Sequence, residues 1–191
     1  MPRMDSLNEL PFPPLAAAAR EAEPSAIERE VIALYGQFRD PLLRYALSLD
    51  LPVHDAEEVI QEVFLSLFRH LQLRRSRAHL RGWLFRVAHN LGLKQLYVNQ
   101  RSNAKTTPDW ARAMEQLDPS PDPEEELLSA QRHHRLQAVV QALPENDQHC
   151  LRLRAEGLRY REIAAVLGMS LGAVSISLTR SLARLARADG R

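Results

Sequence analysis

The clearest hydrophobic pattern in the chain lies between Asp55 and Leu71. Its apolar residues occupy positions 59, 60, 63, 64, 67 and 71, a spacing that gathers them on one face of an α-helix. Asp55, with Glu58 three residues later, predicts a capping box at the helix start. The opposite face is acidic and has no cation before Phe68, whereas an ordinary solvated face mixes both signs. Two interpretations stay open: a core helix with an acidic N-terminus, or an acidic surface with unpaired carboxylates that binds a basic partner.

The same periodicity predicts a helix on each side. The first spans residues 27–49, where Pro41 implies a kink or a break near Asp40. The second spans residues 80–98. Its inward residues are expected to be Leu84, Val87, Ala88 and Leu91, with Leu93 or Tyr97. Three helices of this length form one compact domain over residues 27–102.

Beyond residue 123 the pattern becomes helical again. Helices are expected at 124–143, 147–156, 160–167 and 171–186, and Gly157 is expected to close the second of them as its C′ residue. The prolines and acidic residues of 103–124 predict a linker, and the prolines of 1–26 predict a flexible extension. No segment alternates like a strand, so the predicted fold class is all-α: two small helical domains, the second over 125–187, joined by the acidic linker.

Composition narrows the class of protein. Hydrophobic residues are 45% of the 191 residues and charged residues 26%, as in ordinary globular proteins. The single cysteine excludes a disulfide framework and fits a reducing cytoplasm. No apolar run approaches the ~20 residues of a membrane span, and the short run at 15–19 lacks the basic region of a signal peptide. We therefore expect a cytoplasmic protein without membrane insertion.

The net charge of +1 conceals two basic segments separated by an acidic one. Residues 71–105 carry eight basic and no acidic side chains, residues 106–130 one basic and seven acidic, and residues 131–191 ten basic and five acidic. Basic segments inside folded regions favour contact with a polyanion. Aromatic residues interleaved with the first basic segment suit single-stranded nucleic acid, whose bases stack on aromatic rings; they are Trp83, Phe85 and Tyr97. The alternative is a basic solvated face above core aromatics.

Residues 159–185 predict a helix-turn-helix: an eight-residue helix, a three-residue turn and a longer helix that would lie in the DNA major groove. Gly168 gives the turn a permissive backbone, Ser170 caps the second helix, and the small Ala164 lets the helices cross closely. Between the helices, we expect Ile163, Ala164 and Leu167 to face Val174, Leu178 and Leu182. The residues left exposed are Gly172, Ala173, Ser175, Ile176, Ser177, Thr179 and Arg180, and the candidate phosphate contacts are Arg159, Arg161, Arg180, Arg184 and Arg187. The alternative is a plain helical hairpin.

No arrangement of residues predicts catalysis, a metal or a cofactor. His133, His134, His149 and Cys150 lack the spacing of zinc ligands, because adjacent histidines on a helix point to different faces. No serine–histidine–aspartate set and no pair of catalytic carboxylates emerges. We therefore expect a protein that has no catalytic residues, no metal ligands and no bound cofactor, and is not an enzyme by itself.

Three segments together resemble one family, the extracytoplasmic-function (ECF) group of bacterial RNA polymerase sigma factors, within the sigma-70 family. Residues 55–71, DAEEVIQEVFLSLFRHL, are similar to the group's D-A-E-D-hydrophobic-hydrophobic-Q-E-x-F helix. Residues 81–96, RGWLFRVAHNLGLKQL, are similar to its W-L-x-x-hydrophobic-A-x-N segment. Residues 157–185, GLRYREIAAVLGMSLGAVSISLTRSLARL, are similar to its helix-turn-helix.

The resemblance implies a promoter-specificity subunit, with 27–102 as sigma region 2 and 125–187 as sigma region 4. It implies contact with core RNA polymerase through Asp55, Glu58, Gln61 and Glu62. It implies contact with the −10 element of promoter DNA through Arg74, Arg75, Arg77, Arg81, Trp83, Arg86, His89, Asn90 and Lys94. It implies contact with the −35 element through Arg161, Gly172, Ala173, Ser175, Ile176, Ser177, Thr179 and Arg180. Because anti-sigma factors commonly regulate such proteins, we expect one as a further partner.

The second helix of the helix-turn-helix departs from the family pattern. Ala173, Ser175, Ile176 and Ser177 stand where the family usually has Thr, Lys or another polar residue, Ser and Arg. The exposed face is therefore less basic, which leaves two outcomes open: contact of Ile176 with a thymine methyl, or weak −35 affinity. Arg159 also replaces a capping Ser, at a cost of ~1 kcal/mol. The alternative function is a free-standing helix-turn-helix regulator that binds duplex DNA without polymerase.

Overall fold

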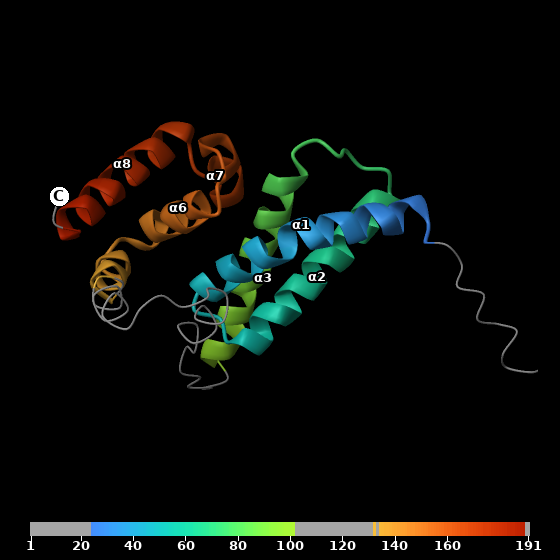
Figure 1. The fold of residues 1–191 in the computed structure, drawn as a ribbon, viewed down its shortest axis with the longest axis horizontal. Coiled ribbons are helices and arrows are strands. Elements are labelled where there is room, and N and C mark those ends of the chain that lie inside the picture. Colours follow the sequence, from blue (N-terminus) through green and yellow to red (C-terminus); the bar gives the residue numbers. More distant parts are fainter. Residues whose placement is uncertain (1–23, 102–131, 133, 190–191) are drawn as a thin grey trace, which may run out of the picture.

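The computed structural model describes residues 24–101, 132 and 134–189. Every regular element in these ranges is a helix, which confirms the predicted all-α fold of two small helical domains (Figure 1). The linker at 103–124 lies outside the described residues, as does the N-terminal extension up to residue 23. The helix expected at 124–143 is described only from residue 132, and residues 134–141 are helical.

The first domain opens with α1 (Ala26–Ser48), which is continuous through Pro41. Of the two outcomes expected near Asp40, a kink or a break, the break is therefore absent. Leu42 and Tyr45, which follow the proline, are 0% and 1% exposed. Their burial against the neighbouring helices stabilises the turn that the missing proline N–H weakens.

The second helix, α2 (Val53–Gln72), starts earlier than expected. Its N-cap is Pro52, whose carbonyl accepts a hydrogen bond from the Ala56 N–H at 2.9 Å. The capping box predicted between Asp55 and Glu58 is therefore wrong: both residues lie inside a helix whose entry the fixed backbone of proline has already set. The apolar face is confirmed. Its members are Val59, Ile60, Val63, Phe64, Leu67 and Leu71, each at most 6% exposed.

The third helix, α3 (Leu80–Arg101), buries Leu84 and Ala88 as expected. It also buries Phe85 completely, with its ring 5.7 Å from that of Tyr45. Phe85 is therefore a core residue and no base-stacking platform. Leu93 and Tyr97, offered as alternative inward residues, are 36% and 58% exposed, so neither is a core residue.

The second domain contains α6 (Glu145–Ala155), α7 (Tyr160–Leu167) and α8 (Leu171–Ala188). The expected helix-turn-helix details are present: Gly168 has φ +65° at the turn, and Ser170 Oγ accepts from the Ala173 N–H at 3.1 Å. Gly157, with φ +80°, follows α6 as expected. Leu182 does not join the contact between α7 and α8, since it is 50% exposed.

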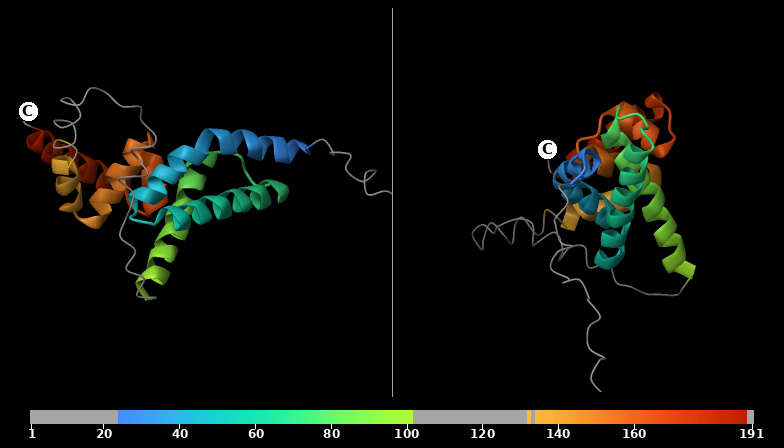
Figure 2. Two further views of the ribbon diagram at one scale, coloured as in Figure 1. Left: turned by 60° about the horizontal axis from the view of Figure 1, so that its bottom comes forward. Right: turned by 90° about the vertical axis from the view of Figure 1, so that its right-hand side faces the viewer.

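The two domains pack against each other. Contacts join α3 to α7 and α1 to α6, and the views of Figure 2 show the orange and red helices against the end of α1 and the green start of α3. One hydrophobic cluster runs through both domains. It includes Leu42, Leu84 and Phe85 of the first domain and Cys150, Leu153, Ile163 and Leu178 of the second. The interdomain contact is therefore continuous with the core.

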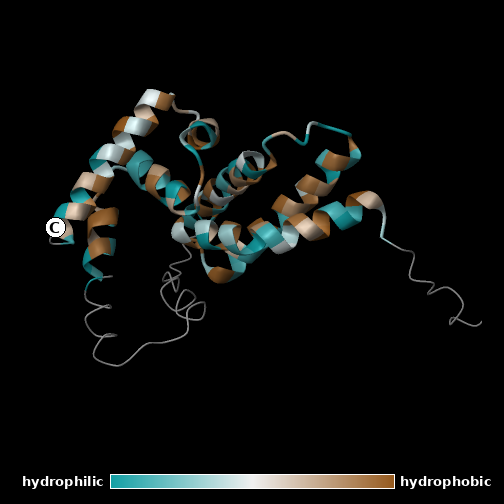
Figure 3. Cartoon of the chain, turned by 45° about the horizontal axis from the view of Figure 1, so that its top comes forward, coloured by the Kyte–Doolittle hydropathy of each residue, from teal (hydrophilic) through white to brown (hydrophobic). Residues whose placement is uncertain are grey.

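Each long helix carries both hydrophilic and hydrophobic residues along its length (Figure 3). Among the described residues, no single helix is long and apolar enough to cross a membrane. The helices α7 and α8 meet the length and composition criteria only as a pair, and that pair is bent by 107°.

Candidate nucleic-acid interface

The acidic face of α2 carries the residues expected to bind polymerase. Contrary to the expectation of unpaired carboxylates, His54 Nε2 lies 3.3 Å from Glu58 and Arg69 Nη1 lies 3.5 Å from Glu62. The two carboxylates are 58% and 45% exposed. Surface pairs of this kind contribute roughly 0–1 kcal/mol, so a basic partner can replace them at small cost. Gln61 lies between them on the exposed face.

Asp55 differs from the other three residues of this set. Its Oδ2 accepts a hydrogen bond from Asn99 Nδ2 at 2.6 Å, which ties the start of α2 to the end of α3. Asp55 therefore has a structural contact inside the first domain, whatever it binds outside.

A shallow groove of about 130 Å³ runs beside this face, between α1 and α2. It is lined by Tyr35, Arg39, Leu43, Glu57, Ile60 and Gln61. Tyr35 is 42% exposed, and its ring lies 4.8 Å from that of Phe64. The lining of the groove comes from two helices, so a pattern within one helix does not reveal it.

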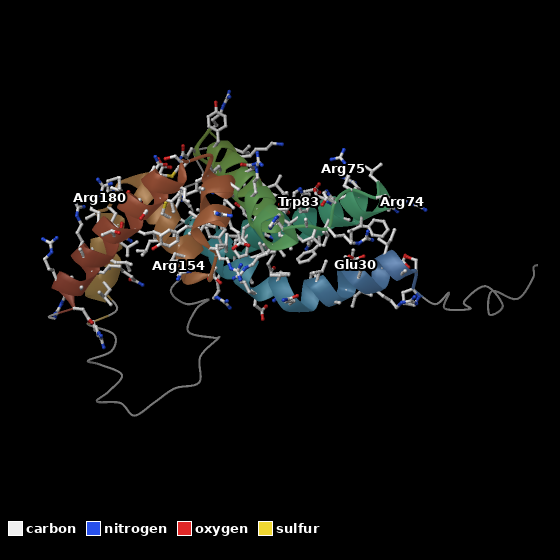
Figure 4. All side chains as sticks on the ribbon, turned by 90° about the horizontal axis from the view of Figure 1, so that it is seen from above. Glu30, Arg74, Arg75, Trp83, Arg154 and Arg180 are labelled. Atoms are coloured by element: carbon white, nitrogen blue, oxygen red, sulfur yellow. The ribbon has the colours of Figure 1, made fainter. Side chains whose placement is uncertain are left out.

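The loop between α2 and α3 carries three arginines, of which two project outward and one is paired. Arg74 and Arg75 project outward at the end of the first domain farthest from α8 (Figure 4). Arg77 instead donates to Glu30 of α1, with Nε to Oε1 at 2.9 Å and Nη2 to Oε2 at 3.0 Å. Two of the loop cations are therefore open to a phosphate, whereas the third fastens the loop to α1.

The outward face of α3 carries a stripe of polar residues one helical turn apart. Arg86, Asn90 and Lys94 are all exposed, and their i, i+4, i+8 spacing puts them on one side of the helix. Trp83 lies beside this stripe but is half-buried, with its ring 4.6 Å from that of His70. This face presents two cations and one partly exposed indole to solvent.

Arg81 and His89 were expected on the same DNA-binding surface, but they face the second domain. Arg81 Nη2 donates to the backbone carbonyl of Glu156, at the end of α6. The His89 ring meets the His149 ring edge to face, with centroids 5.1 Å apart, and both residues are 7% exposed. His89 is therefore not accessible to DNA in this arrangement, and Arg81 is only partly exposed because the second domain holds its guanidinium.

Titratable groups cluster at this contact. Burial, and then the neighbouring His149, lower the pKa of His89 to about 4, while Glu145 opposes the shift. Burial and Arg152 likewise lower the pKa of His149. Burial raises the pKa of Tyr45, whose hydroxyl keeps its proton and lies 2.8 Å from His89 Nδ1. The contact therefore favours the neutral form of both histidines.

Ion pairs surround the histidine pair. Arg44 Nη2 lies 2.9 Å from Glu156 Oε2, and Arg152 Nη2 lies 4.0 Å from Asp50 Oδ2. Burial lowers the pKa of Arg152, an effect that Asp50 opposes. These pairs join the end of α1 to α6 and add polar contacts to the apolar interface.

On α8, the residues expected to face DNA are not all exposed. Gly172, Ile176, Thr179 and Arg180 are exposed, whereas Ala173 and Ser175 are partly buried. Ser177 is 2% exposed, so the expectation that it is left exposed is wrong. It faces α6, where its Oγ donates to Asp147 Oδ1 at 2.7 Å. No signal within α8 identifies this contact, because Asp147 lies 30 residues earlier in the chain.

The start of the helix-turn-helix forms a hollow of about 760 Å³. Its lining combines expected −35 contacts with residues of both domains: His79, Arg159, Tyr160, Arg161, Glu162, Leu171, Gly172 and Ser175. The predicted contacts Arg161, Gly172 and Ser175 are therefore brought together, as the proposed docking of a helix N-terminus in the major groove requires.

Comparisons with known proteins agree with this arrangement. Residues 34–102 match the family described as Sigma-70 region 2, and residues 133–185 match the family described as Sigma-70, region 4. Over 80% of its length the chain is 32% identical to the ECF RNA polymerase sigma factor SigE of Mycolicibacterium smegmatis. It spans 58% of the length of that relative.

Two solved structures share the fold. CnrH, in complex with the cytosolic domain of CnrY, matches with a TM-score of 0.56 and 24% identity, over 83% of this chain and 86% of that one. The sigma factor RpoE of Bartonella quintana, in complex with the anti-sigma factor NepR, matches with a TM-score of 0.55 and 18% identity, over 82% and 96%. Taken with the two family matches and the sequence relative, the order of acidic helix, basic helix and helix-turn-helix leads to one conclusion: the chain belongs to the sigma-70 family, in its extracytoplasmic-function group.

Proposed function

We propose that this protein binds core RNA polymerase and directs initiation at promoters with matching −10 and −35 elements. The observation that carries the proposal is the combination, in one chain, of the acidic α2 and basic α3 with a separate helix-turn-helix. In this proposal the polymerase performs the chemistry and the chain supplies promoter selection, without a cofactor. We assign it to the cytoplasm, where polymerase and promoter are found.

The proposed division of labour follows the predicted domains. Residues 27–102 bind polymerase and the −10 element, the linker 103–124 connects, and residues 125–187 bind the −35 element. On α2, the exposed Glu58 and Gln61 form the polymerase surface together with the partly exposed Glu62. On the first domain, the −10 surface consists of Arg74, Arg75, Trp83, Arg86, Asn90 and Lys94.

The docked arrangement of the two domains restricts which promoter elements the chain can bind at once. Elements named −10 and −35 lie about 25 base pairs apart, or ~85 Å along duplex DNA at 3.4 Å per base pair. In the described structure α3 contacts α7 directly. Both elements can be bound at once only if the domains separate, and separation would also release Arg81 and His89 toward the −10 element.

A partner that keeps the domains together would prevent this separation. We propose an anti-sigma factor in that role, because the structural neighbours were solved with the cytosolic domain of CnrY and with the anti-sigma factor NepR. Its expected effect is to lower initiation without changing which promoter is used.

The test is binding of the full chain to core polymerase, followed by run-off transcription from genomic promoters. Glu58→Lys is expected to weaken polymerase binding by at least about tenfold, because it places like charges face to face. Gln61→Ala is expected to weaken binding as well. Gln37→Ala is the matched control, since Gln37 is also an exposed helical glutamine but lies on α1.

The proposal is wrong if the wild-type chain neither binds core polymerase at micromolar concentration nor directs initiation from any promoter. Tight and specific binding to duplex DNA without polymerase would instead favour a free-standing regulator. Equal losses in the Gln61 and Gln37 variants would show that the acidic face of α2 is not the polymerase surface.

A further inference from the structure

A buried carboxylate lies beneath α8 in the second domain. Asp147 sits in the first turn of α6, and its side chain is 3% exposed. Its Oδ1 accepts from Ser177 Oγ at 2.7 Å, and its Oδ2 accepts from Arg180 Nε at 3.0 Å and Arg180 Nη2 at 2.6 Å. Both oxygens are thus engaged by side chains one turn apart on α8.

This contact uses only one edge of the Arg180 guanidinium. The group has five N–H donors, and Asp147 takes the Nε–H and one Nη2–H. The opposite edge keeps the remaining Nη1–H and Nη2–H donors, and half of the side chain is exposed. Those parallel donors match the O6 and N7 acceptors of guanine in the major groove.

The position of Arg180 on α8 fits such a contact. It lies one turn after Ile176, which is 67% exposed, so the two share a face. The first two turns of α8 contain no basic residue. Arg180 is therefore the first cation of the recognition helix, and the carboxylate fixes its direction before any DNA binds (Figure 4 shows it on the outer side of α8).

We propose that Asp147 is a positioning residue for sequence recognition: it holds Arg180 so that its free edge donates two hydrogen bonds to a guanine of the −35 element. The inference rests on the proposed function. An arginine held in place loses less side-chain freedom on binding than a mobile one, so the contact discriminates between bases more sharply. A phosphate contact would need no such constraint.

The test uses holoenzyme assembled from core polymerase and the full chain, on promoters with one −10 element and a randomised −35 hexamer. The wild type is expected to prefer guanine at one position. Arg180→Ala is expected to reduce that preference by about tenfold or more, as loss of a bidentate arginine–guanine pair does. Asp147→Asn is expected to reduce the preference severalfold at the same position, because it removes the charge that orients the guanidinium.

Ser177→Ala is the matched control. It removes the other hydrogen bond of the same carboxylate, so it lowers thermal stability as Asp147→Asn does, but it leaves the Arg180 contact in place. The expected result is a retained guanine preference in Ser177→Ala and a weakened one in Asp147→Asn. If both variants lower initiation equally from all −35 sequences, Asp147 has only a structural role and the inference is wrong.

Two further outcomes separate the inference from the function on which it rests. If Arg180→Ala weakens initiation uniformly and lowers the salt dependence by about one unit, Arg180 contacts phosphate, and the inference is overturned. Initiation that is independent of the −35 sequence would also overturn it and leave the proposed function standing. Absence of initiation from every promoter would overturn both.

Discussion

The two helices proposed to meet the promoter present charge in different ways. On α3, Arg86 and Lys94 stand on an exposed face, and no ion pair with the described residues restrains them. On α8, the exposed face is neutral until Arg180, which a buried carboxylate restrains. Unrestrained cations attract any phosphate backbone in a salt-dependent way, whereas a restrained arginine favours particular bases. The comparison suggests that α3 contributes most of the attraction and α8 contributes selectivity.

The surroundings of the two helices explain this difference better than their composition. Residues 71–105 hold eight cations, but in the structure Arg77 pairs with Glu30 and Arg81 donates to the second domain. What remains for DNA is the subset on the solvent face of α3 and at the tip of the loop. A count of charges therefore overstates the DNA-binding surface of the first domain.

The largest expected effect comes from reversing the free charges of α3. The double variant Arg86→Glu and Lys94→Glu should lower initiation on the order of 100-fold, because two attractive phosphate contacts become repulsive. The slope of log affinity against log salt should fall by about 1.4 for single-stranded contacts. The measurement is run-off transcription over a range of salt concentrations.

The matched control for this reversal is Arg29→Glu with Arg135→Glu, two exposed arginines outside the proposed −10 surface. It makes the same change in net charge. Equal losses in both double variants would show that overall charge, and not the stripe on α3, governs promoter binding.

A second effect concerns the docking of the second domain against α3, which low pH should weaken. The lowered pKa values of His89 and His149 mean that separated domains take up protons more readily than docked ones. Docking is therefore fully favoured above the ordinary histidine pKa of about 6.5 and is lost as the pH falls toward 4. The ratio of separated to docked chains should rise by up to about tenfold per pH unit for each proton bound.

The measurement for this effect is the radius of gyration of the free chain by X-ray scattering between pH 7.5 and pH 5. Two acids face this cluster and oppose the opening: Glu145 raises the pKa of His149, and Asp50 raises the pKa of Arg152. The double variant His89→Gln and His149→Gln should show a radius that depends little on pH. The same expansion in that variant would assign the pH response to other groups.

A third and smaller effect concerns the absence of an unrestrained cation from the first two turns of α8. Ile176→Lys gives the recognition helix an unrestrained cation like those of α3. It should strengthen promoter binding severalfold at low salt and raise the salt slope by about 0.9. Leu182→Lys adds the same charge at an exposed position one to two turns away, and should have the smaller effect. Ile176→Ala tests separately whether Ile176 contacts a thymine methyl.

The sequence predicts well what depends on local spacing and poorly what depends on docking. The apolar face of α2, the turn at Gly168 and the cap at Ser170 follow from residues within a few positions of one another, and each is present. The burial of His89 and Ser177 depends on partners that lie 60 and 30 residues away in the sequence. The helical spacing of apolar residues does not reveal such distant contacts. The roles of individual residues toward polymerase and DNA stay predictions.

The smallest expected effect concerns α7, the helix that connects the two sides of this comparison because it touches both α3 and α8. Arg159 is its N-cap, and a guanidinium cannot accept the hydrogen bond that a serine would accept. Half of a capping box is present, since the Arg159 N–H donates to Glu162 Oε2 at 2.7 Å. Arg159→Ser should complete the box and raise the free energy of unfolding by about 0.5–1 kcal/mol.

Chemical denaturation of the full chain measures this gain, and Arg161→Ser is the matched control. It removes the same charge from the first turn of α7 without supplying a cap. Equal stabilisation by both variants would mean that relief of positive charge near the helix N-terminus, and not the cap, is the cause. Because Arg159 also lines the hollow at the start of α8, its loss should lower the salt slope of promoter binding while stability rises. A higher free energy of unfolding together with a lower salt slope would show that the stability of α7 and its attraction for DNA depend on different groups.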